Sequence, residues 1–229
     1  DGCTLAADRL YFTKQFTALD IWRKARLMVE HNRPRTARNA VQIVAPDAAN
    51  LVPDAINNAE KFLAKHIAAP QKVRQELVVM ALIKVATTDA DKADKLMRNK
   101  WQPYLTTEER HWVWGVIGRQ SAMRLDDDAL SHFARVAHDK DLNDDMLGWK
   151  VRAALRASNT PKWAVVESSI AAMSADARKD PTWIYWHARA LLARKKTTPQ
   201  VQQEATAALE SIAGVRGFYE QRSEERRVG

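Results

Sequence analysis

Apolar residues recur along the chain at the spacing of an α-helix, in segments that short polar breaks separate. Trp112, Val116 and Ile117, for example, fall on one side of a helix. Apolar positions at i, i+3, i+4 and i+7 indicate amphipathic helices. The pattern predicts about a dozen of them, over residues 4–14, 17–31, 34–45, 52–67, 70–87, 89–99, 107–121, 126–138, 143–157, 161–173, 181–195 and 199–213.

Helix start signals support these segments. Thr106 and Glu109 have the spacing of a capping box, in which each side chain bonds the backbone of the other residue. Thr160, Asp180 and Thr198 each stand before a proline, which is favoured at the first position of a helix. These signals predict helices that begin within a few residues of them.

The fold class predicted from this pattern is all-α, an α-superhelix (solenoid) of about a dozen short antiparallel helices. So many short helices, joined by short turns, cannot all surround one core, whereas stacked hairpins can each pack on their neighbours. Composition agrees, because the chain has 37 Ala but only 7 Gly and 8 Pro. No fixed 34-residue period with the tetratricopeptide pattern is present, so any repeat is degenerate.

One segment, "DPTWIYWHARALLARKK", gathers three aromatic residues within four positions. Trp183, Trp186, Ala190 and Leu191 fall on a single stripe of a helix. Aromatic residues at helical spacing usually form a seam between helices, so we expect core packing here rather than a surface that stacks a ligand.

The net charge of +8 favours anionic partners. Basic residues gather at Arg23, Lys24 and Arg26, and then at Arg33, Arg35 and Arg38. Two interpretations remain open, a solvated face and a surface that contacts an anionic polymer. A nucleic-acid binder would be expected to interleave such residues with glycine-rich or aromatic recognition elements, which are missing.

Motifs for cofactors and metals do not match. Neither a GxxxxGK[ST] loop nor a GxGxxG motif after a strand occurs, and no two His stand at i, i+4. Glu108 and His111 form one Glu-x-x-His, but di-iron bundles need two. In "DKDLNDDMLGWK", which starts at Asp139, Asp144 and Lys150 replace the Gly and Glu of a calcium loop. We therefore predict no cofactor and no metal, and an inter-helix turn that supplies an N-cap.

The chain offers no run of about 20 apolar residues for a membrane span. Its first residues, "DGCTLAADRLYF", lack the apolar region of a signal peptide and an initiator Met, so we expect a segment of something longer. Cys3 is the single cysteine and can form no internal disulfide.

Several segments resemble the soluble lytic murein transglycosylases. "WIYWHARAL" is similar to a W-x-Y-W-x-A-x-x-L helix near the end of that family's helical ring, and "GVRGFYEQ" is similar to the Gly-Phe-Tyr step after it. Upstream, "LGWKVRAALRASNTPKWAVVESSIAAM" resembles the helix pair that precedes it, and "CTLAADRLYFTKQFTALDIWRKARLMVEHN" resembles an earlier pair. The segment "TEERHWVWGVIGRQSAM" fits the region between them, in register. The similarity extends over most of the chain from Cys3 to Tyr219.

The resemblance implies a periplasmic protein whose helical ring lies beside a lysozyme-like catalytic domain. Such enzymes cleave murein glycan strands to 1,6-anhydromuropeptides, with one Glu serving as acid and then as base. In the family that Glu begins a Glu-Ser motif, which a Gly-Leu-Met-Gln segment follows. Glu167-Ser168 repeats the dipeptide, but "SIAAMSADARKD" follows it within an expected helix. We therefore expect no catalytic residue in this chain.

Residues 1–217 are accordingly expected to be most of a non-catalytic ring-type scaffold, and the charged residues 218–229 a truncated or non-native tail. The implied partners are peptidoglycan glycan strands and the catalytic domain of the same full-length chain. Arg33, Arg35 and Arg38 would attract the strands weakly, and Cys3 would have its disulfide partner upstream. Two other classes stay open: a solenoid adaptor that binds protein partners, similar to tetratricopeptide proteins, and a basic helical-repeat nucleic-acid binder.

Overall fold

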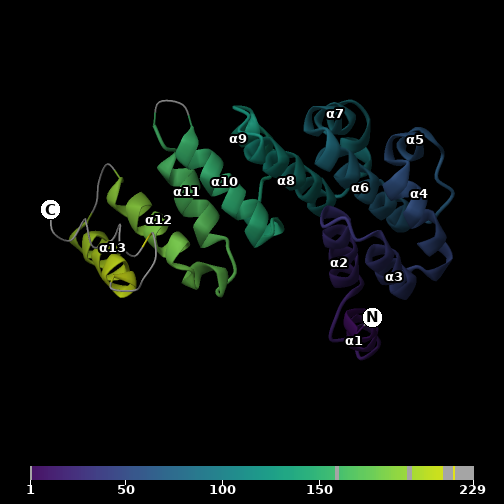
Figure 1. The fold of residues 1–229 in the computed structure, drawn as a ribbon, viewed down its shortest axis with the longest axis horizontal. Helices are drawn as coiled ribbons and strands as arrows, with labels where there is room; N and C mark the ends of the chain where they lie inside the picture. Colours follow the sequence, from purple (N-terminus) through teal and green to yellow (C-terminus); the bar gives the residue numbers. More distant parts are fainter. Residues whose placement is uncertain (1, 158–159, 195–197, 214–218, 220–229) are drawn as a thin grey trace. The chain divides into compact units, whose positions relative to one another are not determined.

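The computed structural model of the protein describes residues 2–157, 160–194, 198–213 and 219. Within these ranges the chain forms thirteen α-helices with short 3-10 and π turns between them, and no strand (Figure 1). The predicted fold class, an all-α superhelical arrangement of short helices, is confirmed. The chain divides into two compact units, residues 1–120 and residues 121–229.

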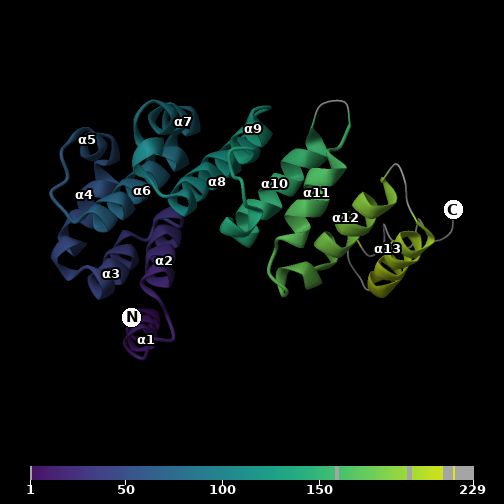
Figure 2. The same cartoon turned by 180° about the vertical axis from the view of Figure 1, so that it is seen from behind.

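In the first unit the long helix α6 is enclosed by its neighbours. Contacts to α6 come from α2, α4, α5 and α7 (Figures 1 and 2). The helices of this unit are α1 (Gly2–Phe12), α2 (Ala18–Glu30), α3 (Pro34–Val44), α4 (Val52–Asn57), α5 (Ala59–Ala64), α6 (Gln71–Thr88), α7 (Ala90–Leu96) and the greater part of α8 (Thr107–Met123).

The sequence of α6 explains why it is enclosed. Every residue from Leu77 to Ile83 is buried, which covers all sides of a helix rather than one stripe. A helix that is apolar all round is stable only when other elements surround it. The one-sided pattern expected for residues 70–87 therefore understated the burial of this helix.

The second unit is a run of helices in which each contacts the next. The end of α8 is followed by α9 (Ala129–Phe133), α10 (Asp144–Arg156), α11 (Trp163–Ala171), α12 (Pro181–Leu192) and α13 (Pro199–Ile212). The main contacts join α10 to α11, α11 to α12, and α12 to α13. This succession of neighbours is the solenoid packing that short helices with short turns predict.

Most of the expected start signals hold. Thr106 and Glu109 form the predicted capping box, with backbone-to-side-chain distances of 2.8 and 3.3 Å. Asp180 and Thr198 cap α12 and α13 through their side chains, and Asn143 caps α10. At Thr160-Pro161 the helix begins within the expected few residues, at Trp163, but the cap expected from Thr160 is not formed, because α11 has no side-chain cap.

A capping box that the sequence analysis did not single out starts α2. The Thr17 side chain accepts from the Asp20 backbone, and the Thr17 backbone donates to the Asp20 carboxylate. Hydrogen bonds from the Thr17 side chain and backbone lower the pKa of Asp20. This capping box fixes the residue at which α2 begins.

Two predicted helices are shorter than expected. The segment 52–67 divides at Asn58, whose backbone leaves the helical region with φ −125° and ψ 37° and separates α4 from α5. The segment 126–138 is helical only over Ala129–Phe133, because the three aspartates before it favour turns over helix. Residues Pro46–Leu51, expected as a break, form a 3-10 helix.

Helix α12 has two seams, whereas the sequence pattern predicted one. The fully buried residues Tyr185, Ala188 and Leu191 pack against α13. Trp183 and Trp186 are only half-buried. Trp183 lies against Gly148 of α10, whereas Trp186 touches both sides, because its ring lies 6.5 Å from the Trp163 ring of α11 and also packs against the α12–α13 core. An inner helix of a solenoid touches a neighbour on each side, so both stripes are packing surfaces.

The charged tail expected at residues 218–229 lies outside the described residues, apart from Tyr219. The Tyr219 ring lies 5.4 Å from that of Tyr185 and packs against the α12–α13 core. Among the described helices, none combines the length and the apolar character needed to cross a membrane.

Candidate functional site

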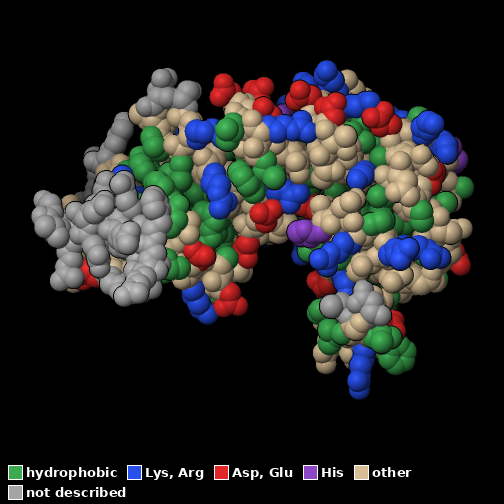
Figure 3. Space-filling view, viewed as in Figure 1, with side chains coloured by type: hydrophobic (Ala, Val, Ile, Leu, Met, Phe, Trp, Pro, Cys, Tyr) green, Lys and Arg blue, Asp and Glu red, His purple; other side chains and the backbone are tan. Residues whose placement is uncertain are grey.

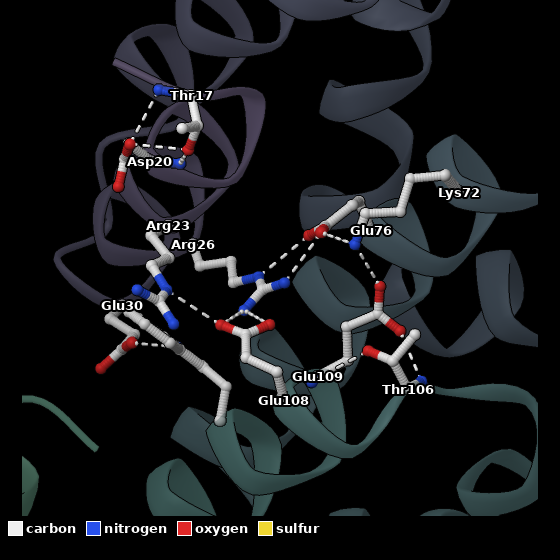
Figure 4. Close-up of polar contacts among 11 residues, drawn as sticks. Thr17, Asp20, Arg23, Arg26, Glu30, Lys72, Glu76, Thr106, Glu108 and Glu109 are labelled. Carbon is white, nitrogen blue, oxygen red and sulfur yellow. Dashed lines mark hydrogen bonds and ion pairs between the residues drawn. The ribbon is translucent and has the colours of Figure 1, made fainter. Parts of the chain in front are cut away.

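Six charged side chains, alternating in sign, connect α2, α6 and α8 of the first unit (Figure 4). Arg26 is at the centre and is fully buried. Its Nε and Nη2 donate to the two oxygens of Glu76 at 2.9 and 2.8 Å, and its Nη1 donates to Glu108 at 3.0 and 2.9 Å. Arg23 donates from Nε to the same Glu108 at 2.9 Å. A guanidinium held by two carboxylates is a strong and directional contact.

The charge of Arg26 is maintained by these partners. Burial alone would lower the pKa of Arg26, but the charges of Glu76 and Glu108 and their hydrogen bonds outweigh burial and raise it. A buried charge is tolerated only when it is paired in this way. Arg26 therefore ties α2 to both α6 and α8.

Lys72 extends the network from α6 to the start of α8. Its Nζ lies 2.7 Å from Glu76 and 2.6 Å from Glu109, the residue that closes the capping box with Thr106. Burial acts to lower the pKa of Lys72, yet hydrogen bonds to Glu109 and Glu76 raise it. We call the six residues Arg23, Arg26, Lys72, Glu76, Glu108 and Glu109 the ionic network.

A second buried pair lies beside the ionic network. Glu30, at the end of α2, accepts from the indole of Trp112 at 2.8 Å and lies 2.9 Å from Nη1 of Arg119. The Arg26 guanidinium lies 5.3 Å from the centroid of the Trp112 ring, a cation–π contact. Because each carboxylate in these contacts has a cationic or indole partner, the arrangement fixes helices and is poorly suited to proton transfer.

The two groups of basic residues that the sequence predicted as one surface, at positions 23–26 and 33–38, differ in their exposure. Arg26 is buried, so the expectation of one solvated or polymer-binding face was wrong for this residue. Arg33, Arg35 and Arg38, which begin and line α3, are exposed. Lys and Arg side chains gather over α2 and α3 in Figure 3. Whether the three arginines contact a ligand stays a prediction.

A cavity of about 330 Å³ lies between the end of α5, the first half of α6 and the segment before α8. Its lining includes side chains with basic, aromatic and amide groups, among them Lys65, Arg74, Gln75, Lys100, Trp101 and Tyr104. The size is at the lower end of ligand pockets. We call it the α6 cavity.

The aromatic wall of the α6 cavity comes from an irregular segment between α7 and α8. Residues Met97–Trp101 form a π turn and Gln102–Tyr104 a 3-10 turn. π turns are rare and frequently occur at functional sites. The Trp101 and Tyr104 rings meet edge to face at 6.1 Å, and Gln75 of α6 donates to the Tyr104 carbonyl at 2.7 Å.

The sequence pattern does not predict this aromatic wall. Trp101 and Tyr104 fall between two predicted helices, so no helical stripe includes them. A usable signal was present: two aromatic residues flanked by Lys100 and Pro103 in a short break. Their proximity to the face of α6 could be read only from the fold.

The two motifs rejected in the sequence, the calcium-like loop and the Glu-Ser dipeptide, have acidic side chains that form ion pairs with basic residues. Lys150 lies 2.6 Å from Asp139, so a lysine ammonium neutralises the first residue of the calcium-like loop. Glu167 accepts from Nε of Arg194 at 3.0 Å, and its other oxygen contacts the same guanidinium. Within the described ranges, no three His, Cys, Asp or Glu side chains are grouped to hold a metal ion.

Comparison with known proteins identifies a similar fold among solved structures. No protein-family model and no curated protein matches the chain. Among solved structures, an X-ray structure of an inactive mutant of the lytic transglycosylase Slt from Pseudomonas aeruginosa is similar, with a TM-score of 0.59 and 20% sequence identity. The match covers 96% of this chain and 35% of that chain, so the chain spans about a third of that protein's length. The fold of this chain is therefore lytic transglycosylase-like.

Proposed function

We propose that the chain is a helical scaffold segment of a lytic transglycosylase, which guides murein glycan strands toward a catalytic domain of the same full-length protein. The observation that carries this proposal is the similarity in fold to a lytic transglycosylase over 96% of the chain. The order and spacing of the resembling motifs, such as Trp183 to Leu191, support it as well. A protein with this role works in the periplasm, where murein lies.

The proposed scaffold role is non-catalytic. Glu167, the residue that repeats the family's Glu-Ser dipeptide, lies within α11 and is bound by Arg194. Glu167 is therefore engaged in an ion pair on a packed helix, which is a structural role rather than that of a residue that transfers a proton to a substrate.

The chain of residues 1–229 is expected to release no 1,6-anhydromuropeptides from purified sacculi, and Glu167→Gln is expected to change nothing. Chromatography of the soluble products, with an active lytic transglycosylase as positive control, measures this. Release by the chain that Glu167→Gln abolished would show that the segment is itself catalytic.

Contact with murein is expected to be electrostatic and spread over the surface of the first unit. The exposed Arg33, Arg35 and Arg38 lie on or beside α3, and the stem peptides of murein carry carboxylates. Exposed charge pairs are weak and are screened by salt. The proposal therefore favours many weak contacts over one tight site.

Binding of the chain to sacculi should fall when salt is raised from about 0.1 M to about 1 M, because the Debye length shortens from about 10 Å to about 3 Å. Replacing Arg33, Arg35 and Arg38 by Gln should weaken binding about fivefold, on the order of 1 kcal/mol for three screened contacts. Sedimentation with sacculi measures binding, and circular dichroism verifies that the helices persist.

A control variant with Gln at Lys95, Lys140 and Arg178, three exposed residues elsewhere, removes the same charge. It should bind nearly as the unchanged chain does. If binding is indifferent to salt and to both triple variants, while a nucleic acid or a protein binds tightly, the murein proposal fails.

A solenoid adaptor is the second candidate, and one observation favours it. In α1 the side chains of Leu5 and Phe12 are 70% and 88% exposed, an apolar surface of a kind that binds protein partners. A partner whose binding is lost with Phe12→Ser, without loss of murein binding, would support this role beside the scaffold role.

A further inference from the structure

The α6 cavity has a charge pattern that a merely structural hollow does not need. Among its described lining residues none is Asp or Glu, whereas Lys65, His66, Arg74 and Lys100 are all basic. One face of α6 supplies Gln71, Arg74, Gln75 and Val78, which follow the helical spacing i, i+3, i+4 and i+7. The cavity is therefore set up for a ligand that carries negative charge.

Arg74 is the cation best placed to receive that charge. Lys65 already lies 3.4 Å from Asp54, and Lys100 donates to the Leu63 carbonyl while it covers the Trp101 ring at 4.6 Å. In the described parts of the chain, no carboxylate pairs with the guanidinium of Arg74. A half-buried guanidinium without a partner matches a carboxylate in both charge and geometry.

The wall opposite α6 fits a ring with an apolar face. Tyr104 is 65% exposed, although its backbone is fixed by Gln75 and its ring lies edge-on to that of Trp101. An exposed aromatic ring held in a defined orientation is a surface on which the C–H face of a sugar can pack. The amide groups of Gln71 and Gln75 can donate to and accept from ring hydroxyls.

The position of this wall depends on the ionic network. Lys72 and Glu76 lie on α6 one residue along from Gln71 and Gln75, and Lys72 holds Glu109 and hence the start of α8. Tyr104 and Leu105 immediately precede that start. The cavity is thus pre-formed, which reduces the entropy cost of binding.

We propose that the α6 cavity binds a pyranose that carries a free carboxylate, the acidic sugar of a glycan strand from which the stem peptide has been removed. Arg74 receives the carboxylate, Tyr104 packs on the ring, and the two glutamines bond its hydroxyls. The proposal rests on the proposed function for its choice of a glycan over a peptide. It adds a defined binding site to the diffuse attraction expected at Arg33, Arg35 and Arg38.

Three small probes separate the two halves of the ligand. N-acetylmuramic acid carries the ring and the carboxylate, N-acetylglucosamine is the same ring without the lactyl carboxylate, and D-lactate is the carboxylate without the ring. Amide chemical shifts of the isotope-labelled chain should move at residues of the α6 cavity. N-acetylmuramic acid should bind about tenfold more tightly than either of the others.

Single substitutions test separately the contact of Arg74 with the carboxylate and that of Tyr104 with the sugar ring. Arg74→Gln should remove the advantage of N-acetylmuramic acid over N-acetylglucosamine and leave the binding of the neutral sugar unchanged. Tyr104→Ala, at an exposed position, should weaken both sugars. Lys95→Gln, which removes an exposed charge on α7 away from the cavity, should change neither.

The proposal is overturned by the absence of saturable shifts at about 10 mM N-acetylmuramic acid, by shifts confined to residues outside the cavity, or by equal binding of D-lactate. An unchanged preference in Arg74→Gln would overturn it too. If sacculi bind in a salt-dependent manner while these probes do not, the α6 cavity proposal fails and the scaffold proposal stands. If neither sacculi nor probes bind, the scaffold proposal fails as well.

Discussion

Replacing Arg26 by Met is expected to lower the free energy of unfolding by about 3 kcal/mol, because it leaves part of a buried carboxylate charge without its partner. Arg26 is fully buried between Glu76 and Glu108. The loss should be at the lower end of the usual range of about 3–5 kcal/mol, since Lys72 remains 2.7 Å from Glu76. Urea unfolding followed by circular dichroism measures the change, and hydrogen exchange of peptides from α2 and α6 localises it.

Arg23→Met is the matched control, on the same helix and toward the same Glu108. The Arg23 side chain is 36% exposed, so its removal should cost less than about 1 kcal/mol. Combining Arg26→Met with Glu76→Leu should recover much of the loss, because Arg23–Glu108 and Lys72–Glu109 stay paired. Equal losses in the two single variants would contradict the role assigned to the buried pair.

In the second unit, Gly148→Leu is expected to lower the free energy of unfolding by about 3 kcal/mol through overpacking. A Cβ at Gly148 would come within 3.0 Å of the Trp183 ring and 3.0 Å of the Arg152 guanidinium. The Arg152 guanidinium also lies over the Trp183 ring at 5.2 Å, so a Leu side chain at Gly148 would have to displace both side chains from their contact. Gly148→Ala should change stability by less than about 1 kcal/mol, because the gain in helix propensity offsets the tight contact.

A double-mutant cycle tests whether Trp183 is the cause. Trp183→Ala alone should cost about 3 kcal/mol as a half-buried seam residue, and in that background Gly148→Leu should cost little because the removed indole leaves space. Urea unfolding of the four proteins gives the coupling. Strictly additive effects would show that Gly148 is restricted by something other than the indole.

The sequence predicted the local structure well where one residue decides it. The capping box at Thr106 and Glu109, the caps at Asp180 and Thr198, and the all-α class all follow from short-range chemistry. The prediction failed at Asn58, where the expected single helix over 52–67 divides into α4 and α5. Asn is a weak helix former, but that preference alone does not say at which residue a helix breaks.

Burial on more than one side was harder to predict. A single stripe was enough to find α12 as a helix, but the burial of Tyr185 and Ala188 against α13 became apparent only with both neighbours in place. Arg26 falls on the apolar stripe of α2, which is a usable signal for a buried ion pair. Its partner Glu76, 50 positions away, carries no such mark in the sequence.

The α6 cavity could not be predicted from the sequence. Its walls come from the end of α5, one face of α6 and the turns after α7. Each contributes residues that look ordinary alone, such as Lys65, Arg74 and Tyr104. Only their juxtaposition gives a basic hollow with an aromatic wall.

The ionic network has a consequence for how the first unit folds. In a simple repeat array each hairpin touches only its neighbours, so such an array can fray from one end while the remainder stays intact. Arg26 instead bonds residues 50 and 82 positions further along the chain. Residues 1–120 should consequently melt in a single cooperative transition, and they should fold more slowly than their short helices suggest, because distant segments must meet before Arg26 gains its partners.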